Sequence, residues 1–268
     1  MVCARPTERA FFGAAALLFV ASTAGTILWC GSGSRMGAMP MGSGRAMSTV
    51  WMPAPWMPMP GESWLGAAAS FLGMWIVMMV AMMLPSLVPM LHRYRNAVAG
   101  AGEARLGSLT ALVGLGYFFV WTVLGMAVFV LGASLSLVAT GLPFPAWAAP
   151  LAAGLVVLIA GALQFTAWKA RHLACCREVP GHGRVLAADA STAWRHGLRL
   201  GLHCCYCCGG LMAILLVIGI MDLRAMAAVM AAITLERLAP AGQRIAQASG
   251  VVIVVAGLFL IVRAGGVG

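Results

Sequence analysis

The sequence has few charged residues and very few acidic ones. Only 9% of its 268 residues are charged, with 7 acidic and 17 basic side chains. A soluble domain carries about 25% charged residues, so a water-soluble globular protein is excluded as a class. The sequence also lacks a phosphate-binding glycine loop, a nucleophile elbow and the His-Glu helix motif of zinc proteases. These absences argue against an ATPase and against hydrolases of those classes, and we predict no enzymatic activity.

Long apolar runs dominate the sequence instead, since 62% of the residues are hydrophobic. A helix needs about 20 apolar residues to cross the hydrocarbon core of a bilayer. This predicts an all-α fold, a polytopic membrane helical bundle of about seven transmembrane helices, or about six if the first is cleaved. The runs lie at residues 10–30, 64–91, within 108–139, within 147–168, 200–220, 225–238 and 245–262. The sixth run is short and contains Glu236, so we expect a partial or tilted helix there.

The basic residues are distributed unevenly between the segments that join these runs. If the amino terminus is cytoplasmic, all but four of the 17 Lys and Arg residues fall on the cytoplasmic side. Cytoplasmic loops of membrane proteins are enriched in Lys and Arg. We therefore expect a multi-pass protein of the bacterial inner membrane, with a cytoplasmic amino terminus if the first helix is not cleaved and a periplasmic carboxyl terminus. The expected partner of this basic chain is the lipid bilayer, not nucleic acid.

Three segments follow from this topology. Residues 1–30 are predicted to be an N-terminal transmembrane helix or a signal sequence. Residues 31–63 are predicted to be an outer loop rich in Met, Gly and Pro, with too little hydrophobic content to fold alone. Residues 64–268 are predicted to be the membrane-embedded helical bundle, with a cytoplasmic loop at residues 169–199.

The segment 203–208 carries the densest group of candidate metal ligands. It reads His203-Cys204-Cys205-Tyr206-Cys207-Cys208. Residues spaced by three and four share one side of a helix, which here applies to Cys204, Cys207, Cys208 and Met212. His203 and Cys205 lie at the two edges of that side. Sulfur and imidazole ligands suit Cu(I) or Zn(II) rather than Mg²⁺ or Ca²⁺, although cysteine also packs as a small apolar residue.

A second group of candidate ligands precedes this segment in the predicted cytoplasmic loop. Its members are His172, Cys175, Cys176 and His182. The group either completes one site with the cysteines at 204–208 or receives metal that arrives from the cytoplasm. The alternative is an ordinary basic loop that contains Cys and His by chance.

Methionine is abundant, with 19 residues in the chain. Thioethers suit Cu(I), and the predicted outer loop contains Met36, Met39, Met41, Met47, Met52, Met57 and Met59. In the second run, Met78, Met82 and Met83 belong to a stripe at helical spacing, and we expect them to line a route for a soft cation. The alternative is that these methionines fill gaps in a packing surface.

Asp222 and Glu236 are the acidic residues closest to membrane depth. Carboxylates within membrane segments are costly and often functional. Each has a basic neighbour in the sequence, Arg224 and Arg237 respectively. We therefore expect each acidic residue to pair with its neighbour at the membrane interface.

From the second run onward, a series of short motifs accompanies the cysteines. These are Trp75, Ala81-Met82-Met83-x-Pro85, Gln164-x-Thr166-x-x-Lys169, Gly201, Cys204-x-x-Cys207-Cys208, Leu211, Met212, Gly219-x-Met221 and Glu236-Arg237. In these motifs the sequence resembles a bacterial family of predicted metal-binding integral membrane proteins of unknown function. In the predicted loop, Cys176 matches the second of two spaced cysteines of that family, whereas the first falls on His172. The resemblance implies a helical membrane protein that binds a metal.

The sequence thus predicts an inner-membrane protein that binds a soft metal and transports or delivers it, with a metal-donor or acceptor protein as partner. We favour copper, as Cu(I), with Zn(II) as the alternative. The expected ligands are Cys204, Cys207, Cys208, Met212, His203, Cys205, His172 and Cys176. Two other functions stay open: a membrane thiol-disulfide oxidoreductase that uses the same cysteines, and an accessory or assembly subunit of a membrane complex.

Overall fold

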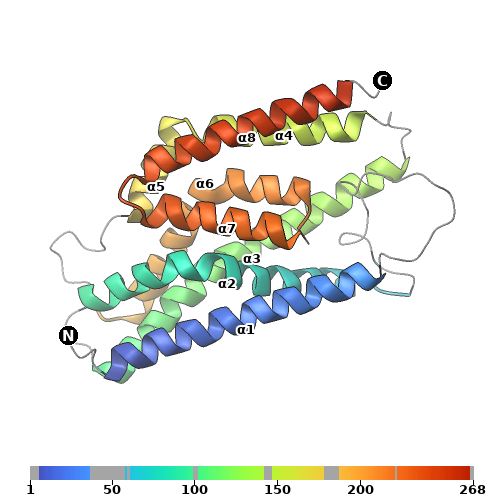
Figure 1. Ribbon diagram of the computed structural model, residues 1–268. Helices are drawn as coiled ribbons and strands as arrows, with labels where there is room; N and C mark the ends of the chain where they lie inside the picture. Colours follow the sequence, from blue (N-terminus) through green and yellow to red (C-terminus); the bar gives the residue numbers. More distant parts are fainter. Residues whose placement is uncertain are drawn as a thin grey trace.

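The computed structural model describes residues 6–36, 58, 61–98, 102–141, 147–177, 187–220 and 222–265, and the secondary structure of this part is entirely helical. The predicted all-α fold is confirmed. The helices are α1 (Pro6–Met36), α2 (Trp64–Ala97), α3 (Glu103–Gly141), α4 (Ala148–Leu163), α5 (Ala167–Arg177), α6 (Ala190–Ile218), α7 (Leu223–Leu238) and α8 (Gly242–Gly265) (Figure 1).

Five of these helices, α1, α2, α3, α6 and α8, are long and apolar enough to cross a membrane. Helices α4 and α5 are bent by 67° relative to each other and add a sixth span if they are taken together. Helix α7 lies where the sequence predicts a short sixth helix. Its 16 residues extend about 24 Å at 1.5 Å per residue, less than the roughly 30 Å of the hydrocarbon core. The described residues therefore supply five or six candidate spans, where the sequence predicts about seven.

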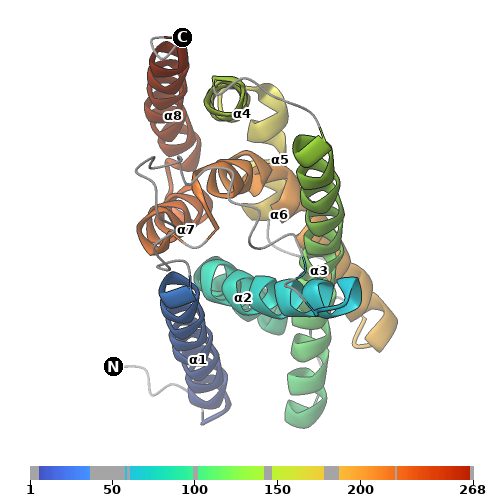
Figure 2. The same ribbon diagram turned by 90° about the vertical axis from the view of Figure 1, so that its right-hand side faces the viewer.

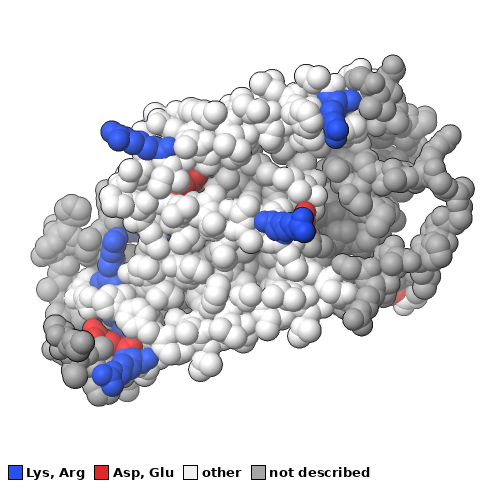
Figure 3. All heavy atoms as spheres, in the orientation of Figure 1, with Lys and Arg blue, Asp and Glu red and all other residues white. Residues whose placement is uncertain are grey.

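The helices alternate in direction along the bundle (Figure 1). Helices α1, α3, α6 and α8 run one way, and α2, α4 and α7 run the other. The chain that follows α2 and α7 consequently lies at the end where α1 begins. Most of the Lys and Arg side chains visible in Figure 3 gather toward this end. The alternation agrees with the predicted sorting of basic residues, and the side of the membrane to which this end belongs stays a prediction.

Two helix pairs approach closely, and Figure 2 shows α3 beside α6 and α4 beside α8. At the crossing of α3 and α6, a Cβ atom on Gly116 would lie 2.9 Å from the carbonyl oxygen of Trp194. At the crossing of α4 and α8, a Cβ atom on Gly257 would lie 2.8 Å from the amide nitrogen of Leu158. Small residues allow membrane helices to approach closely. The first crossing fixes α6, which carries the cysteine cluster, against α3.

The apolar core lies between α2, α3, α6 and α7, whereas much of α1 and α8 faces outward. Trp75 and Leu87 of α2 are almost fully buried. Leu28 of α1 and Val262 of α8 are 74% and 73% exposed, as expected of surfaces that contact lipid chains. Helix α1 extends to Met36, and the other methionines of the predicted outer loop lie outside the described residues.

Candidate metal centre

Helix α6 begins ten residues before the predicted start because Asp189 caps it. The Asp189 carboxylate accepts a hydrogen bond from the backbone N–H of Thr192 at 2.7 Å, and the hydroxyls of Ser191 and Thr192 donate to it at 2.8 and 2.7 Å. These hydrogen bonds, led by that of the Thr192 backbone, lower the pKa of Asp189 to about 2. Together with α5, the first turns of α6 occupy much of the segment predicted as a cytoplasmic loop at 169–199.

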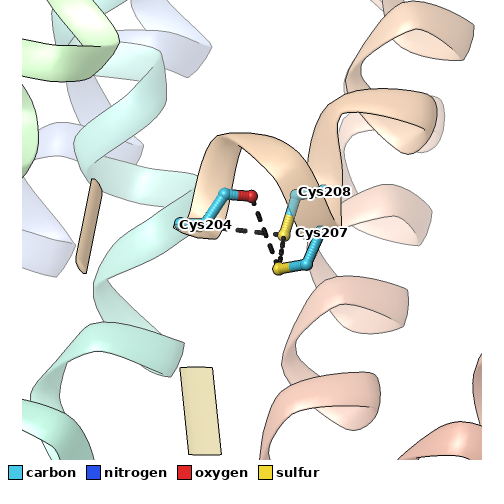
Figure 4. A group of neighbouring side chains, drawn as sticks. All are labelled: Cys204, Cys207 and Cys208. Atoms are coloured by element: carbon cyan, nitrogen blue, oxygen red, sulfur yellow. Dashed lines mark hydrogen bonds between the residues drawn. The ribbon is translucent and has the colours of Figure 1, made fainter. Parts of the chain in front are cut away.

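Three cysteine thiols of α6 converge, as their spacing predicts (Figure 4). The sulfur atoms of Cys204, Cys207 and Cys208 lie within 4.8 Å of one another. The sulfur of Cys208 is 3.7 Å from that of Cys204 and 3.3 Å from that of Cys207. All three side chains are at most 2% exposed and are free thiols. One and a half turns of a single helix thus gather three buried sulfur atoms around one point.

A fourth thiol comes from α5. The Cys176 sulfur lies 3.7 Å from that of Cys207 and is 2% exposed. The 67° bend after α4 directs α5 across α6, and the hydroxyl of Thr166 accepts from the backbone N–H of Lys169 at the start of α5. The structure thus places Cys176 of the predicted loop beside the cysteines of α6, and its role as a metal ligand stays a prediction. Cys175 is exposed, and His182 lies outside the described residues.

A buried arginine contacts the thiol group. One guanidinium nitrogen of Arg237 donates to the Cys204 sulfur at 3.2 Å and to the Ser86 hydroxyl at 2.9 Å, and the other lies 2.9 Å from the sulfur of Met90. The Tyr117 hydroxyl donates to the same Cys204 sulfur at 3.0 Å. Arg237 is only 2% exposed, and it forms no ion pair with a carboxylate of the described residues. The positive charge of Arg237 therefore lies beside the sulfur atoms of Cys204 and Met90.

A second buried cation is neutralised locally. The ammonium group of Lys169 pairs with the Glu236 carboxylate at 2.7 Å and donates to the backbone carbonyl of Cys207. The Ser249 hydroxyl donates to the other carboxylate oxygen of Glu236 at 2.9 Å. Because a buried ion pair has no net charge, Arg237 is the cation beside the thiols that lacks a carboxylate partner among the described residues.

The predicted pairing of neighbours in the sequence is wrong for both acidic residues. Glu236 and Arg237 are each 2% exposed and point to different partners, because adjacent residues of a helix do not face each other. The Asp222 carboxylate accepts from the backbone N–H groups of Arg224 and Ala225 and so caps α7. Neither acidic residue forms the expected pair at the membrane interface.

The two predicted histidine ligands meet each other. The Nδ1 atoms of His172 and His203 lie 3.3 Å apart. Trp168 and Tyr206 flank the His172 ring, with centroid distances of 4.6 and 4.9 Å. Both histidines are half-buried, in contrast to the thiols. They form an imidazole pair at the contact of α5 with α6.

The remaining predicted ligands lie in the same core or at its edge. Met212 is 3% exposed and follows Cys208 by one turn, and Cys205 is half-buried. Met78, Met82 and Met83 are at most 2% exposed, in the core that α2 shares with α6. Their burial is equally compatible with packing, so their role as a route for the ion stays a prediction.

Several residues of the centre are not identified by the sequence analysis. Ser86, Met90 and Tyr117 come from α2 and α3, far from the cysteines in the sequence. The one available signal is the presence of polar side chains within apolar runs, since such groups in a membrane helix usually face the protein interior. That signal applies to Tyr117, Ser86 and Arg237.

Clustered buried thiols suit a soft metal ion such as copper or zinc. A family model described as PpoB2, copper chaperone, matches residues 72–260, which include every side chain of the thiol group. The chain belongs to this family. The predicted resemblance to a metal-binding family is therefore confirmed, and the PpoB2 description together with the cysteine cluster supports copper as the ion. No match was found among curated proteins or among solved structures.

Proposed function

We propose that this protein binds Cu(I) at Cys204, Cys207 and Cys208, with Cys176 as an additional ligand, and delivers the ion to an acceptor protein at the membrane. The observation that carries the proposal is the group of three buried thiols within 4.8 Å of one another. Thiolates are preferred ligands of Cu(I). The copper chaperone family supplies independent support for the choice of metal.

The charges around the thiols favour a monovalent ion. If two of the cysteine ligands bind Cu(I) as thiolates and the others stay protonated, the complex has a net charge of minus one, which the Arg237 guanidinium beside Cys204 compensates. With the same number of thiolates, a Zn(II) complex is one unit less negative and gains less from that guanidinium. Lys169 contributes little to the net charge around the metal ion, because the Glu236 carboxylate neutralises it. The buried arginine therefore supports Cu(I) over Zn(II).

Delivery requires that a competing ligand reach the bound ion. The thiols are buried, but a cavity of about 20 Å³, room for about one water molecule, is lined in part by Cys207, Lys169 and Tyr206. An incoming sulfur ligand would displace the protein thiolates one at a time near Cys207. Transfer of this kind needs no nucleotide hydrolysis, in agreement with the absence of a phosphate-binding glycine loop from the sequence.

The proposed location is the bacterial inner membrane, with the amino terminus in the cytoplasm. Its support is the distribution of basic residues, since most of those visible on the face drawn in Figure 3 lie toward one end of the bundle, and the five or six helices that are able to span a bilayer. Cytoplasmic segments are enriched in Lys and Arg. In a reducing cytoplasm the cysteines would stay available as ligands.

A competition assay tests the binding step. The full chain in detergent, kept anaerobic and reduced, is titrated with Cu(I) against a chromophoric chelator. We expect the wild type to retain about one tightly bound equivalent and the Cys204→Ser/Cys207→Ser/Cys208→Ser variant to lose it. Cys175→Ser is the matched control, because Cys175 is exposed on α5, and it should behave as wild type. Unchanged binding by the triple variant would contradict the proposal.

A transfer assay tests delivery. The copper-loaded protein is mixed with a synthetic peptide that contains a Cys-x-x-Cys motif, and the copper bound to each is followed with time. Ligand exchange predicts a transfer rate that rises with peptide concentration. A rate that does not depend on the peptide concentration would mean that copper first dissociates into water, which a delivery protein is expected to prevent.

A further inference from the structure

The imidazole pair lies beside the thiols on the same two helices. His172 precedes Cys176 by four residues on α5, and His203 precedes Cys207 by four residues on α6. The sulfur atoms of Cys176 and Cys207 are 3.7 Å apart, and the two Nδ1 atoms are 3.3 Å apart. Since about four residues make one helical turn, the nitrogen pair and the sulfur pair are neighbours, separated by one turn on each helix.

The separation of the two nitrogens suits a shared metal ion. Imidazole nitrogens bind metals of this class at about 2.0 Å, so two nitrogens on one ion lie roughly 3.3–4 Å apart, depending on the angle at the metal. The observed 3.3 Å needs little adjustment. Flanking contacts of Trp168 and Tyr206 with the His172 ring restrict its rotation.

The imidazole pair is also the more accessible of the two groups. His172 and His203 are half-buried, whereas Cys176 and Cys207 are each 2% exposed. Tyr206 and Trp168 beside them are 47% and 40% exposed. Between α5 and α6, the imidazoles therefore lie nearer than the thiols to the outer surface of the bundle.

We propose that His172 and His203 form a second, peripheral Cu(I) site through which the ion enters and leaves the thiol centre. The inference rests on the proposed function of that centre and adds the step that connects it to the surface. In this step a Cu–N bond breaks as a Cu–S bond to Cys207 or Cys176 forms. The copper remains Cu(I), so no oxidant or reductant is needed, and the proton of each thiol that binds passes to a vacated imidazole or to buffer.

The competing explanation is a simple hydrogen bond, in which one Nδ1–H donates to the other Nδ1. That arrangement satisfies both rings without a metal and predicts no effect of the histidines on copper. X-ray absorption at the copper edge separates the two explanations, because it detects imidazole ligands directly. With two equivalents of Cu(I) on the wild-type chain in detergent, we expect both sulfur and imidazole ligands. A spectrum without imidazole would overturn the proposal, whatever the behaviour of any variant.

Variants test the transfer step. We expect His172→Ala/His203→Ala to bind one equivalent rather than two, to keep the affinity of the thiol centre within about threefold, and to pass copper to a soluble chelator at least tenfold more slowly. The single variant His172→Cys replaces the imidazole with another soft ligand and should keep most of the wild-type rate of copper transfer to the chelator. His92→Ala on α2 is the control and should match wild type. A double variant with wild-type stoichiometry and rate would refute a peripheral site.

The thiol variant distinguishes failure of this inference from failure of the proposed function. Cys204→Ser/Cys207→Ser/Cys208→Ser should lose the sulfur-bound equivalent and keep the imidazole-bound one. If it loses both equivalents, the histidines do not form a site of their own. If it keeps the sulfur-bound equivalent, the proposed centre itself is wrong.

Discussion

Replacement of Arg237 by leucine is the most informative single perturbation of the thiol centre. The guanidinium lies 3.2 Å from the Cys204 sulfur and has no carboxylate partner among the described residues. Leucine keeps part of the aliphatic volume and removes the charge. Removal of one partner of a buried ion pair destabilises a protein because it leaves an uncompensated charge, and Arg237→Leu leaves no carboxylate of the described residues unpaired, so we expect the variant to fold.

Coulomb's law gives the size of the effect. Two unit charges about 4 Å apart interact by about 4 kcal/mol at an effective dielectric constant of about 20. The negative charge of a copper–thiolate complex is shared by several sulfur atoms, so we take about 3 kcal/mol for Arg237. At about 1.4 kcal/mol per factor of ten, Arg237→Leu should weaken Cu(I) binding roughly a hundredfold.

Competition with a Cu(I) chelator measures this loss, and Zn(II) titration provides the comparison. Arg237→Lys keeps the charge and should lose less than about tenfold, and Arg224→Leu, at an exposed position on α7, should lose nothing. Zn(II) binding should weaken less than Cu(I) binding, because the zinc complex is less negative. Equal losses for the two metals, or no loss for Cu(I), would refute the role of the charge.

Three further predictions concern stability, each measured by unfolding in detergent. Glu236→Gln leaves the Lys169 ammonium buried without its partner and should lower the free energy of unfolding by about 3–5 kcal/mol. Removal of the Lys169 and Glu236 charges together should restore most of this lost stability. Gly116→Ala should destabilise by about 1–3 kcal/mol, because its Cβ would contact the Trp194 carbonyl, whereas Gly114→Ala, with open space around it, should cost nothing. Asp189→Ala should lower stability above pH 4, and the difference from wild type should vanish as the pH falls through about 2, because the folded-state pKa of this carboxyl is depressed.

The helical bundle follows from apolar run length, which is a local property of the sequence. The convergence of Cys204, Cys207 and Cys208 is also local, because it depends on spacings within one helix. Helix ends are less predictable. Helix α6 begins at Ala190 because one carboxylate caps it, and α7 has only 16 residues, too few to add a span.

The surroundings of the thiols depend on contacts between helices, and these were not predictable from a single sequence. Arg237 follows Glu236 directly, so a sequence pattern pairs them, yet helical geometry sends one to Cys204 and the other to Lys169. The donation from Tyr117 joins residues 87 positions apart. The meeting of His172 with His203 likewise requires the bend between α4 and α5.

The identity of the atoms around the first bound copper ion tests the central claim most directly. X-ray absorption at the copper edge, with one equivalent of Cu(I) on the full chain, should show a ligand shell made of sulfur alone, and Cys204→Ser/Cys207→Ser/Cys208→Ser should abolish it. A shell of nitrogen and oxygen in the wild type, or a sulfur shell that survives in the triple variant, would contradict copper binding at these thiols.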